Sequence, residues 1–200
     1  MNFLRKKIPE YIQSSLEQLE KKPQDWLSLY ANAYQALSYQ NQDMIVRVGK
    51  IGNDYLSTMN IHQIIKTGEQ WRSYTSMLWS IDWNNVDILS MNDYFLQKEG
   101  YVSLLVMGCF HPSGYFREKC LKILVHYPNT LALIMIRMND WVEEIRDKAY
   151  VLAYRRILES SLDELIDASY VFIKIKKSKR RQQTQLDGIE KHYIKRLSDL

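Results

Sequence analysis

A short pattern of residues repeats about 29 positions apart in the middle of the chain, within residues 102–158. The apolar stretch at residues 104–107 aligns with residues 133–136, and residues 116–120 align with residues 145–149. Both members of the second pair read apolar, basic, acidic, basic, small. A recurring word at this period is typical of stacked helical repeats, in which each helix pair buries its apolar face against the next. The pattern predicts an all-α chain and indicates no reaction.

The composition favours a single helical repeat domain over residues 1–200. Hydrophobic residues make up 46% of the chain, enough for a sizeable core. Only seven Gly and four Pro leave little room for the many tight turns of a β-sandwich. We expect the clearest repeats at residues 102–158, a basic segment at residues 174–181 and a terminal helix at residues 182–198.

The charge and the cysteine content limit the class of protein only loosely. The formal net charge of +4 and the pI near 8.9 permit an acidic partner without requiring one. Cys109 and Cys120 are too few for a disulfide framework, so we expect a reducing compartment. Residues 1–7 lack the apolar segment of a secretory signal, and the uncharged run at residues 101–116 is too short and broken to span a bilayer. The sequence predicts a soluble, cytoplasmic protein that does not enter a membrane.

Apolar residues at helical spacing predict further helices on both sides of the repeats. The expected helices cover residues 8–19, 25–37, 44–56, 60–66, 69–81, 86–96, 116–127, 145–153, 162–173 and 182–197. Residues 44–48 also suit a strand, but their helical surroundings favour a helix. Asn60 is expected to cap the fourth helix and Gly68 to end it. The apolar stripe of the helix at residues 162–173 is predicted to comprise Leu162, Leu165, Ile166, Ser169 and Ile173.

Side-chain caps are predicted at three further helix starts. Asp25 stands where the second helix would begin and can accept a hydrogen bond from a free backbone amide. Asp140 with Glu143, and Ser161 with Glu164, have the spacing of a capping box, in which two side chains reciprocally bond two backbone amides.

The two copies of the repeat resemble the HEAT-repeat pattern, in which an Asp-Pro corner precedes a Val-Arg pair and a buried small residue. The matching positions in the second copy are Asp140-Trp141, Ile145-Arg146 and Ala149. Those in the first copy are His111-Pro112, Phe116-Arg117 and Cys120, with His in place of Asp. The period is that of the HEAT-like variety of roughly 30 residues. The resemblance implies a right-handed α-solenoid, an armadillo-like α-α superhelix of helix pairs.

Arg117 and Arg146 occupy equivalent positions one repeat apart. This equivalence favours a structural ladder, in which each guanidinium pairs with a carboxylate or a carbonyl group of the adjacent turn. In a solenoid the second helix of each pair lines the inner face. There Arg117 and Arg146, together with Lys119, Lys122 and Lys148, are candidates for contact with an acidic partner.

Six cations stand close together near the C-terminus. They are Lys174, Lys176, Lys177, Lys179, Arg180 and Arg181. Such a cluster can bind nucleic acid without sequence preference, because neutralising phosphates releases counterions. The alternative is a solvated helix end, since these positions spread widely around a helix axis.

Cys109, His111, Cys120 and His126 carry four side chains of the kind that bind zinc. Their spacing is not that of a zinc finger, and both cysteines align with core positions of the other repeat copy. We therefore expect no metal and no cofactor.

Residues 83–87 resemble the Trp-x-x-Val-Asp segment of HEAT-like DNA glycosylases that remove alkylated purines. The resemblance implies that Trp83 stacks on the damaged nucleotide, that Asp87 stabilises the positive charge developing on the sugar, and that Arg117 holds a phosphate. The structural alternative is that Trp83 packs between helices while Asp87 caps a turn or faces water.

The sequence thus favours a non-enzymatic binding scaffold whose first partner is another protein and whose second is nucleic acid, bound through the basic segment. The alternative is a DNA-repair glycosylase, which needs Trp83, Asp87 and Arg117 exposed together in a basic cleft. The oligomeric state is left open.

Overall fold

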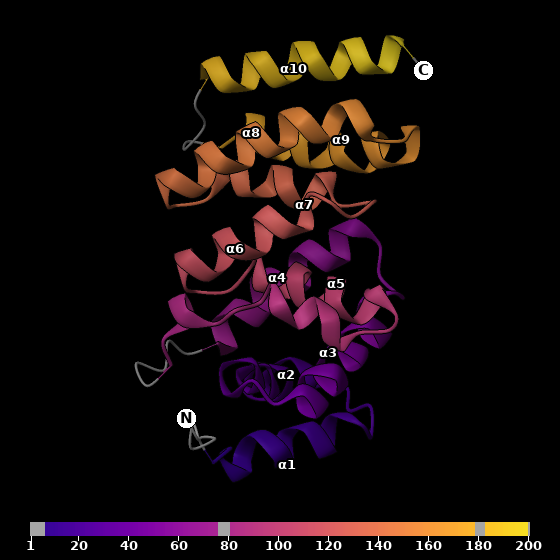
Figure 1. Ribbon diagram of the computed structural model, residues 1–200. Helices are drawn as coiled ribbons and strands as arrows, with labels where there is room; N and C mark the ends of the chain where they lie inside the picture. The colour runs from indigo at the N-terminus through magenta and orange to yellow at the C-terminus, as the bar shows by residue number, and fades with distance from the viewer. Residues whose placement is uncertain (1–6, 76–80, 179–182, 200) are drawn as a thin grey trace. The chain divides into compact units, whose positions relative to one another are not determined.

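The computed structural model describes residues 7–75, 81–178 and 183–199, and within these ranges it is helical with no strand (Figure 1). The prediction of an all-α chain is confirmed. The chain folds as two compact units, Met1–Phe116 and Arg117–Leu200, and the boundary falls inside helix α6 (Gly114–Leu124). A single repeat domain over residues 1–200 stays a prediction.

The first unit is a bundle of α-helices linked by short 3-10 turns. Its elements are α1 (Glu10–Leu19), α2 (Trp26–Tyr34), η1 (Gln35–Tyr39), α3 (Gln42–Leu56), α4 (Ile61–Tyr74), η2 (Trp83–Asn85), η3 (Ser90–Tyr94) and α5 (Lys98–Gly108). Helix α1 packs on α2, α2 on α4, and α3 along α5. Glycine permits the close approach of α3 to α5, because an added Cβ at Gly49 would lie 2.7 Å from the Gly100 carbonyl oxygen. The helix predicted over residues 44–56 is confirmed.

Helix α4 shows why a glycine in a helical pattern is an ambiguous signal. Asn60 caps it as predicted, in a reciprocal capping box with Gln63 at 3.0 and 2.9 Å. Gly68 does not end the helix, so the prediction of separate helices at residues 60–66 and 69–81 is wrong. The absent side chain instead makes room for the ring of Phe110, which lies 2.4 Å from the position of an added Cβ. Residues 76–80 of the second predicted helix lie outside the described residues.

The segment after α4 folds into 3-10 turns, so the prediction of one helix at residues 86–96 is wrong. Carboxylates bind backbone amides locally here. Asp82 accepts a hydrogen bond from the Asn84 amide at 3.0 Å, and Asp87 accepts one from the Ser90 amide at 3.3 Å. Such bonds compete with regular helix formation.

The second unit is also built of packed helices. Beyond the C-terminal part of α6 it contains α7 (Leu131–Ile136), η4 (Arg137–Asn139), α8 (Glu143–Glu159), α9 (Leu162–Lys176) and α10 (Gln183–Ser198). Helix α7 packs against α8 and α9, and α10 lies across both of these (Figure 1). The Tyr193 hydroxyl of α10 donates a hydrogen bond to the Leu165 carbonyl of α9, which ties the last helix to its neighbour.

Two of the predicted caps are wrong. Among the described residues Asp25 makes no side-chain hydrogen bond at the start of α2. Helix α8 begins at Glu143 with Val142 as its N-cap, and Asp140 is engaged elsewhere. Ser161 does accept a hydrogen bond from the Glu164 amide, at 3.3 Å.

The buried face of α9 also differs from the prediction. The residues that it buries are Glu164, Leu165, Ala168, Val171, Phe172 and Ile175. Of the predicted stripe only Leu165 is buried, whereas Leu162, Ile166 and Ile173 are exposed. Helix α9 thus carries two apolar stripes, and the core selects the other one.

Replacing Gly68 with alanine should lower the free energy of unfolding by about 1–3 kcal/mol, because the added methyl collides with the packed ring of Phe110. At a helix position with free space, replacing glycine with alanine raises the free energy of unfolding by about 0.5–1 kcal/mol. The sign of the change therefore shows whether Gly68 is closely packed. Urea unfolding followed by circular dichroism measures the difference.

The matched control is Gly188→Ala in α10. Its Cβ would meet only the hydroxyl of Tyr150, at 2.9 Å, and the end of that side chain can move aside. We expect Gly188→Ala to be neutral or stabilising. A stabilising effect of Gly68→Ala would contradict the close packing of α4 on Phe110.

Candidate functional site

Trp83 lies in an aromatic cluster in the core of the first unit. Its ring centroid is 4.1 Å from that of His111, 5.0 Å from Phe116 and 6.1 Å from Tyr34. The side chain is only 7% exposed. Trp83 therefore packs between elements of the core, and its ring has no open face on which a base could stack.

Asp87 lies at the surface a few residues later. Its carboxylate accepts the hydrogen bond from the Ser90 amide and is otherwise directed to solvent. Both residues thus adopt the arrangement of the structural alternative to the glycosylase resemblance.

The strongest polar feature of the second unit is a buried ion pair between Arg117 of α6 and Asp140 in the turn before α8. The Arg117 Nε and Nη2 atoms donate to the two carboxylate oxygens at 3.1 and 2.8 Å. The side chains are 0% and 1% exposed. This two-pronged geometry is the strongest form of an arginine–carboxylate contact. The guanidinium is occupied within the protein, where no phosphate could reach it.

Further groups complete the pairing of Asp140. The Val142 amide donates to its carboxylate at 3.0 Å, and Arg137 Nη1 lies 3.4 Å away. Arg146 donates to the carbonyl oxygens of Asp140 and Trp141 at 3.0 and 3.3 Å. Arg117 and Arg146 thus pair with a carboxylate and with carbonyl groups of a nearby turn, as predicted, but both bind the same turn at residues 140–141 and not equivalent turns one repeat apart.

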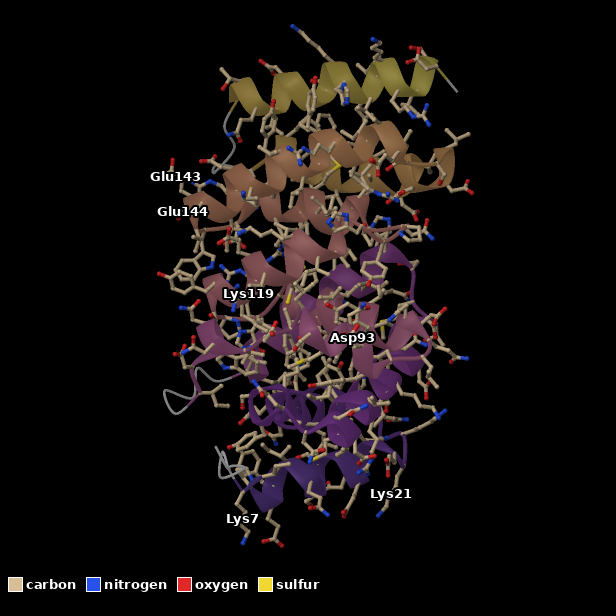
Figure 2. All side chains as sticks on the ribbon, in the orientation of Figure 1. Lys7, Lys21, Asp93, Lys119, Glu143 and Glu144 are labelled. Carbon is tan, nitrogen blue, oxygen red and sulfur yellow. The ribbon has the colours of Figure 1, made fainter. Side chains whose placement is uncertain are left out.

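Trp141 is held at the surface by this network. Its side chain is 58% exposed, and the Arg117 Cζ atom lies 5.6 Å from the centre of its ring. A desolvated guanidinium against an indole face is a favourable cation–π contact. Glu143 and Glu144 follow at the exposed first turn of α8 (Figure 2). The result is a large exposed aromatic surface next to two carboxylates.

A second buried ion pair joins α8 to α9. Arg156 Nη2 lies 2.9 Å from Glu164 Oε2, and both side chains are almost fully buried. The Glu164 carboxylate also accepts hydrogen bonds from the amides of Thr130 and Leu131 at 2.8 and 2.9 Å. Glu164 therefore caps the N-terminus of α7 from a neighbouring helix, rather than reciprocating the Ser161 cap as predicted. Carboxylates are stabilised at this end of a helix.

The pKa of Glu164 reflects opposing effects. Burial raises it, but the hydrogen bond from Arg156, the amides of Leu131 and Thr130 and the charge of Arg156 together outweigh burial. The net effect is a pKa below the usual 4.5.

The structure describes three of the six cations of the basic segment at residues 174–181. Lys174 and Lys177 are exposed on the last turns of α9, while Lys176 forms an ion pair with Glu190 of α10 at 2.8 Å and lies over the Phe172 ring. Lys179, Arg180 and Arg181 lie outside the described residues. Of the other cations considered, Lys122 pairs with Glu118 at 2.6 Å, and Lys119 and Lys148 are partly exposed.

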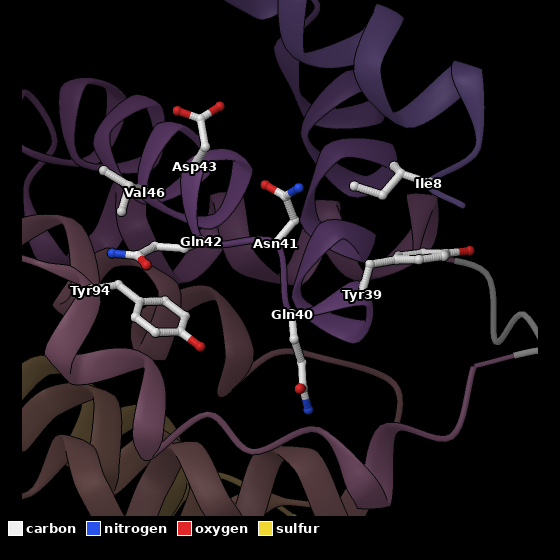
Figure 3. A pocket seen from close by; sticks show the side chains of 8 residues that line it. All are labelled: Ile8, Tyr39, Gln40, Asn41, Gln42, Asp43, Val46 and Tyr94. Carbon is white, nitrogen blue, oxygen red and sulfur yellow. The ribbon is translucent and has the colours of Figure 1, made fainter. Parts of the chain in front are cut away.

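A hollow of the first unit lies at the start of α3 (Figure 3). It has a volume of about 650 Å³ and is lined by Ile8, Tyr39, Gln40, Asn41, Gln42, Asp43, Val46 and Tyr94. Hydroxyl, amide and carboxylate groups of this kind can hydrogen-bond a polar ligand. The eight lining residues include no histidine, cysteine, serine or cation. Asn41 is already engaged by capping α3, where its side-chain oxygen accepts a hydrogen bond from the Met44 amide at 3.1 Å.

Cys109 and Cys120 are both buried, as their alignment with core positions predicted. Within the described residues no group of three or more His, Cys, Asp or Glu is placed to hold a metal ion. In the same part of the chain no helix has the length and apolar character needed to cross a bilayer.

Comparisons with protein-family models, with curated proteins and with solved structures found no match for this chain.

Sequence reasoning missed two features of the second unit. Glu164 fitted a capping box, which concealed its longer reach to α7. Trp141 did carry a signal, because the HEAT pattern has proline at that corner and no apolar stripe includes it.

Breaking the buried pair with Arg117→Met should lower the free energy of unfolding by about 3–5 kcal/mol, because it removes the main partner of a buried carboxylate. The matched control is Arg47→Met, which breaks a largely solvated pair with Glu20 and should cost less than about 1 kcal/mol. Urea titrations of both variants give the comparison. Equal losses would contradict the assignment of Arg117 as a buried structural residue.

The stabilisation that Glu164 provides should depend on pH. Since folding lowers its pKa, the contribution is complete above about pH 4.5 and is lost as the pH falls through the folded-state pKa. We expect Glu164→Gln to be less stable than the wild type at pH 7 and to approach it as the pH falls below about 4.5 toward the folded-state pKa. Thermal unfolding between pH 3 and 7 measures the gap. A gap that stays constant over this range would refute the role of the ionised carboxylate.

Proposed function

We propose that the protein is a non-enzymatic binding scaffold built from HEAT-like helix pairs, stacked as a right-handed α-solenoid, and that it binds another protein. The 29-residue repeat and the pairing of its two equivalent arginines with a repeat corner support this architecture. Each repeat in such a stack contacts only its neighbours, which leaves long helix faces open to a partner.

The observation that carries the proposal is Trp141. Tryptophan is the residue most enriched among the side chains that dominate protein interfaces, where it acts as a large rigid anchor. Here the cation–π contact with Arg117 and the hydrogen bond from Arg146 to its carbonyl fix its position before binding. This reduces the entropy lost on association. The adjacent Glu143 and Glu144 form an acidic rim that suits an apolar pocket bordered by lysine or arginine.

The same contacts favour the scaffold over the glycosylase. Trp83 and Arg117 are both buried in packing and pairing roles, whereas the glycosylase needs them exposed to a nucleotide. A protein is also favoured over nucleic acid as the partner, because Lys176 of the basic segment is paired with Glu190 and its charge is neutralised within the protein.

Quantitative affinity purification from host extract tests the proposal. We expect Trp141→Ala to reduce the amount of recovered partner at least ten-fold, because it removes the anchor. Trp141→Phe, which keeps a ring over Arg117, should retain most of it. The control is Leu89→Ala, which removes an equally exposed apolar side chain in the first unit.

Nuclease treatment and an activity assay complete the test. Recovery of the protein partner should survive nuclease, and the purified protein should release no methylated purine from alkylated DNA. Unchanged recovery with Trp141→Ala, loss of the partner on nuclease treatment, or release of the base would each overturn the proposal.

A further inference from the structure

Helix α9 exposes a continuous line of large apolar side chains. They are Leu162, Ile166, Tyr170 and Ile173, and each is between 47% and 58% exposed. Their spacing of four, four and three residues places them on one face over three turns of the helix. The opposite face of α9 is buried against α7 and α10. Single exposed apolar residues are ordinary, but an aligned set of four indicates a surface that is covered by a partner.

Charges follow the same line along one flank. Asp163, Asp167 and Lys174 each come one position after a member of the apolar line, so they form a parallel row. All three are exposed. The row is acidic toward the N-terminus of α9 and basic toward its C-terminus. When the helix is reversed about its middle, Asp163 at one end of this row lies opposite Lys174 at the other, whereas Asp167 near the middle comes next to its own copy.

We propose that this face binds the same face of a second copy of the chain, with the two α9 helices antiparallel about a two-fold axis near Ala168. Leu162 then lies opposite the second copy's Ile173, and Ile166 opposite its Tyr170. Asp163 lies beside the second copy's Lys174, and the two-fold axis makes this contact twice. A parallel pairing about a two-fold axis would place the two charge rows on opposite sides of the interface, so only the antiparallel arrangement brings Asp163 beside Lys174.

The pairing is of the closed, isologous kind that most homodimers use. A single helix pair buries less than the roughly 1,200 Å² of a stable interface. We therefore expect a dissociation constant on the order of tens of micromolar. The inference rests on α9 alone and does not depend on the function proposed for Trp141.

Sedimentation velocity of the full chain from 1 to 200 µM tests the dimer. The wild type should change from monomer to dimer over this range. Ile166→Glu should raise the dissociation constant at least ten-fold, because it places a carboxylate at the centre of the apolar line. The matched control is Ile194→Glu on α10, also an exposed isoleucine, which should leave the constant unchanged. Trp141→Ala should leave it unchanged as well, which separates this interface from the proposed partner site.

Two charge variants test the antiparallel geometry. Asp163→Lys and Lys174→Glu should each be monomeric when studied alone, because each places like charges in contact across the two-fold axis. Mixed in equal amounts they should form a heterodimer, since both contacts between positions 163 and 174 then join opposite charges. Loss of folding could not be rescued by mixing. A wild type that stays monomeric at 200 µM, or a mixture that fails to dimerise, would overturn the proposal.

Discussion

The buried ion pair between Arg117 and Asp140 is the interaction on which the second unit depends most. Removing two charges from water is costly, and only complete pairing offsets that cost. Here the carboxylate is matched by two guanidinium bonds, by the Val142 amide and by Arg137. The pair fixes α6 against the turn that starts α8. Any other register of these elements would leave a charge buried without its partner.

Glu164 applies the same principle one layer further along the chain. Helix α7 has only six residues, Leu131–Ile136, too few to be stable alone. Its first amides are bonded by a carboxylate from α9, and that carboxylate is neutralised by Arg156 of α8. One side chain thus links three helices. Arg117, to which the glycosylase resemblance assigned a phosphate, likewise acts as a structural connection within the unit.

The sequence predicted those features that depend on local periodicity. The 29-residue repeat indicated helix pairs, and the equivalence of Arg117 and Arg146 indicated partners in a neighbouring turn. Features that depend on distant contacts were not predictable in this way. Gly68 reads as a helix end until Phe110 is known to pack on it. Both apolar stripes of α9 have a helical period, so only the packing of α7 and α10 reveals which one is buried. The sequence around Trp83 is compatible both with a ring that stacks on a ligand and with a ring packed in the core, and only the packing distinguishes them.

The two binding surfaces that we propose, the Trp141 corner and the exposed face of α9, make no use of the buried charged network. The account therefore requires that Arg117 be inaccessible. Nuclear magnetic resonance of the Arg117 Nε–H group tests this most directly. The account predicts a distinct signal at neutral pH whose proton exchanges with water far more slowly than that of a solvated arginine, because Asp140 accepts it in the core. Exchange at the rate of a solvated guanidinium would contradict it.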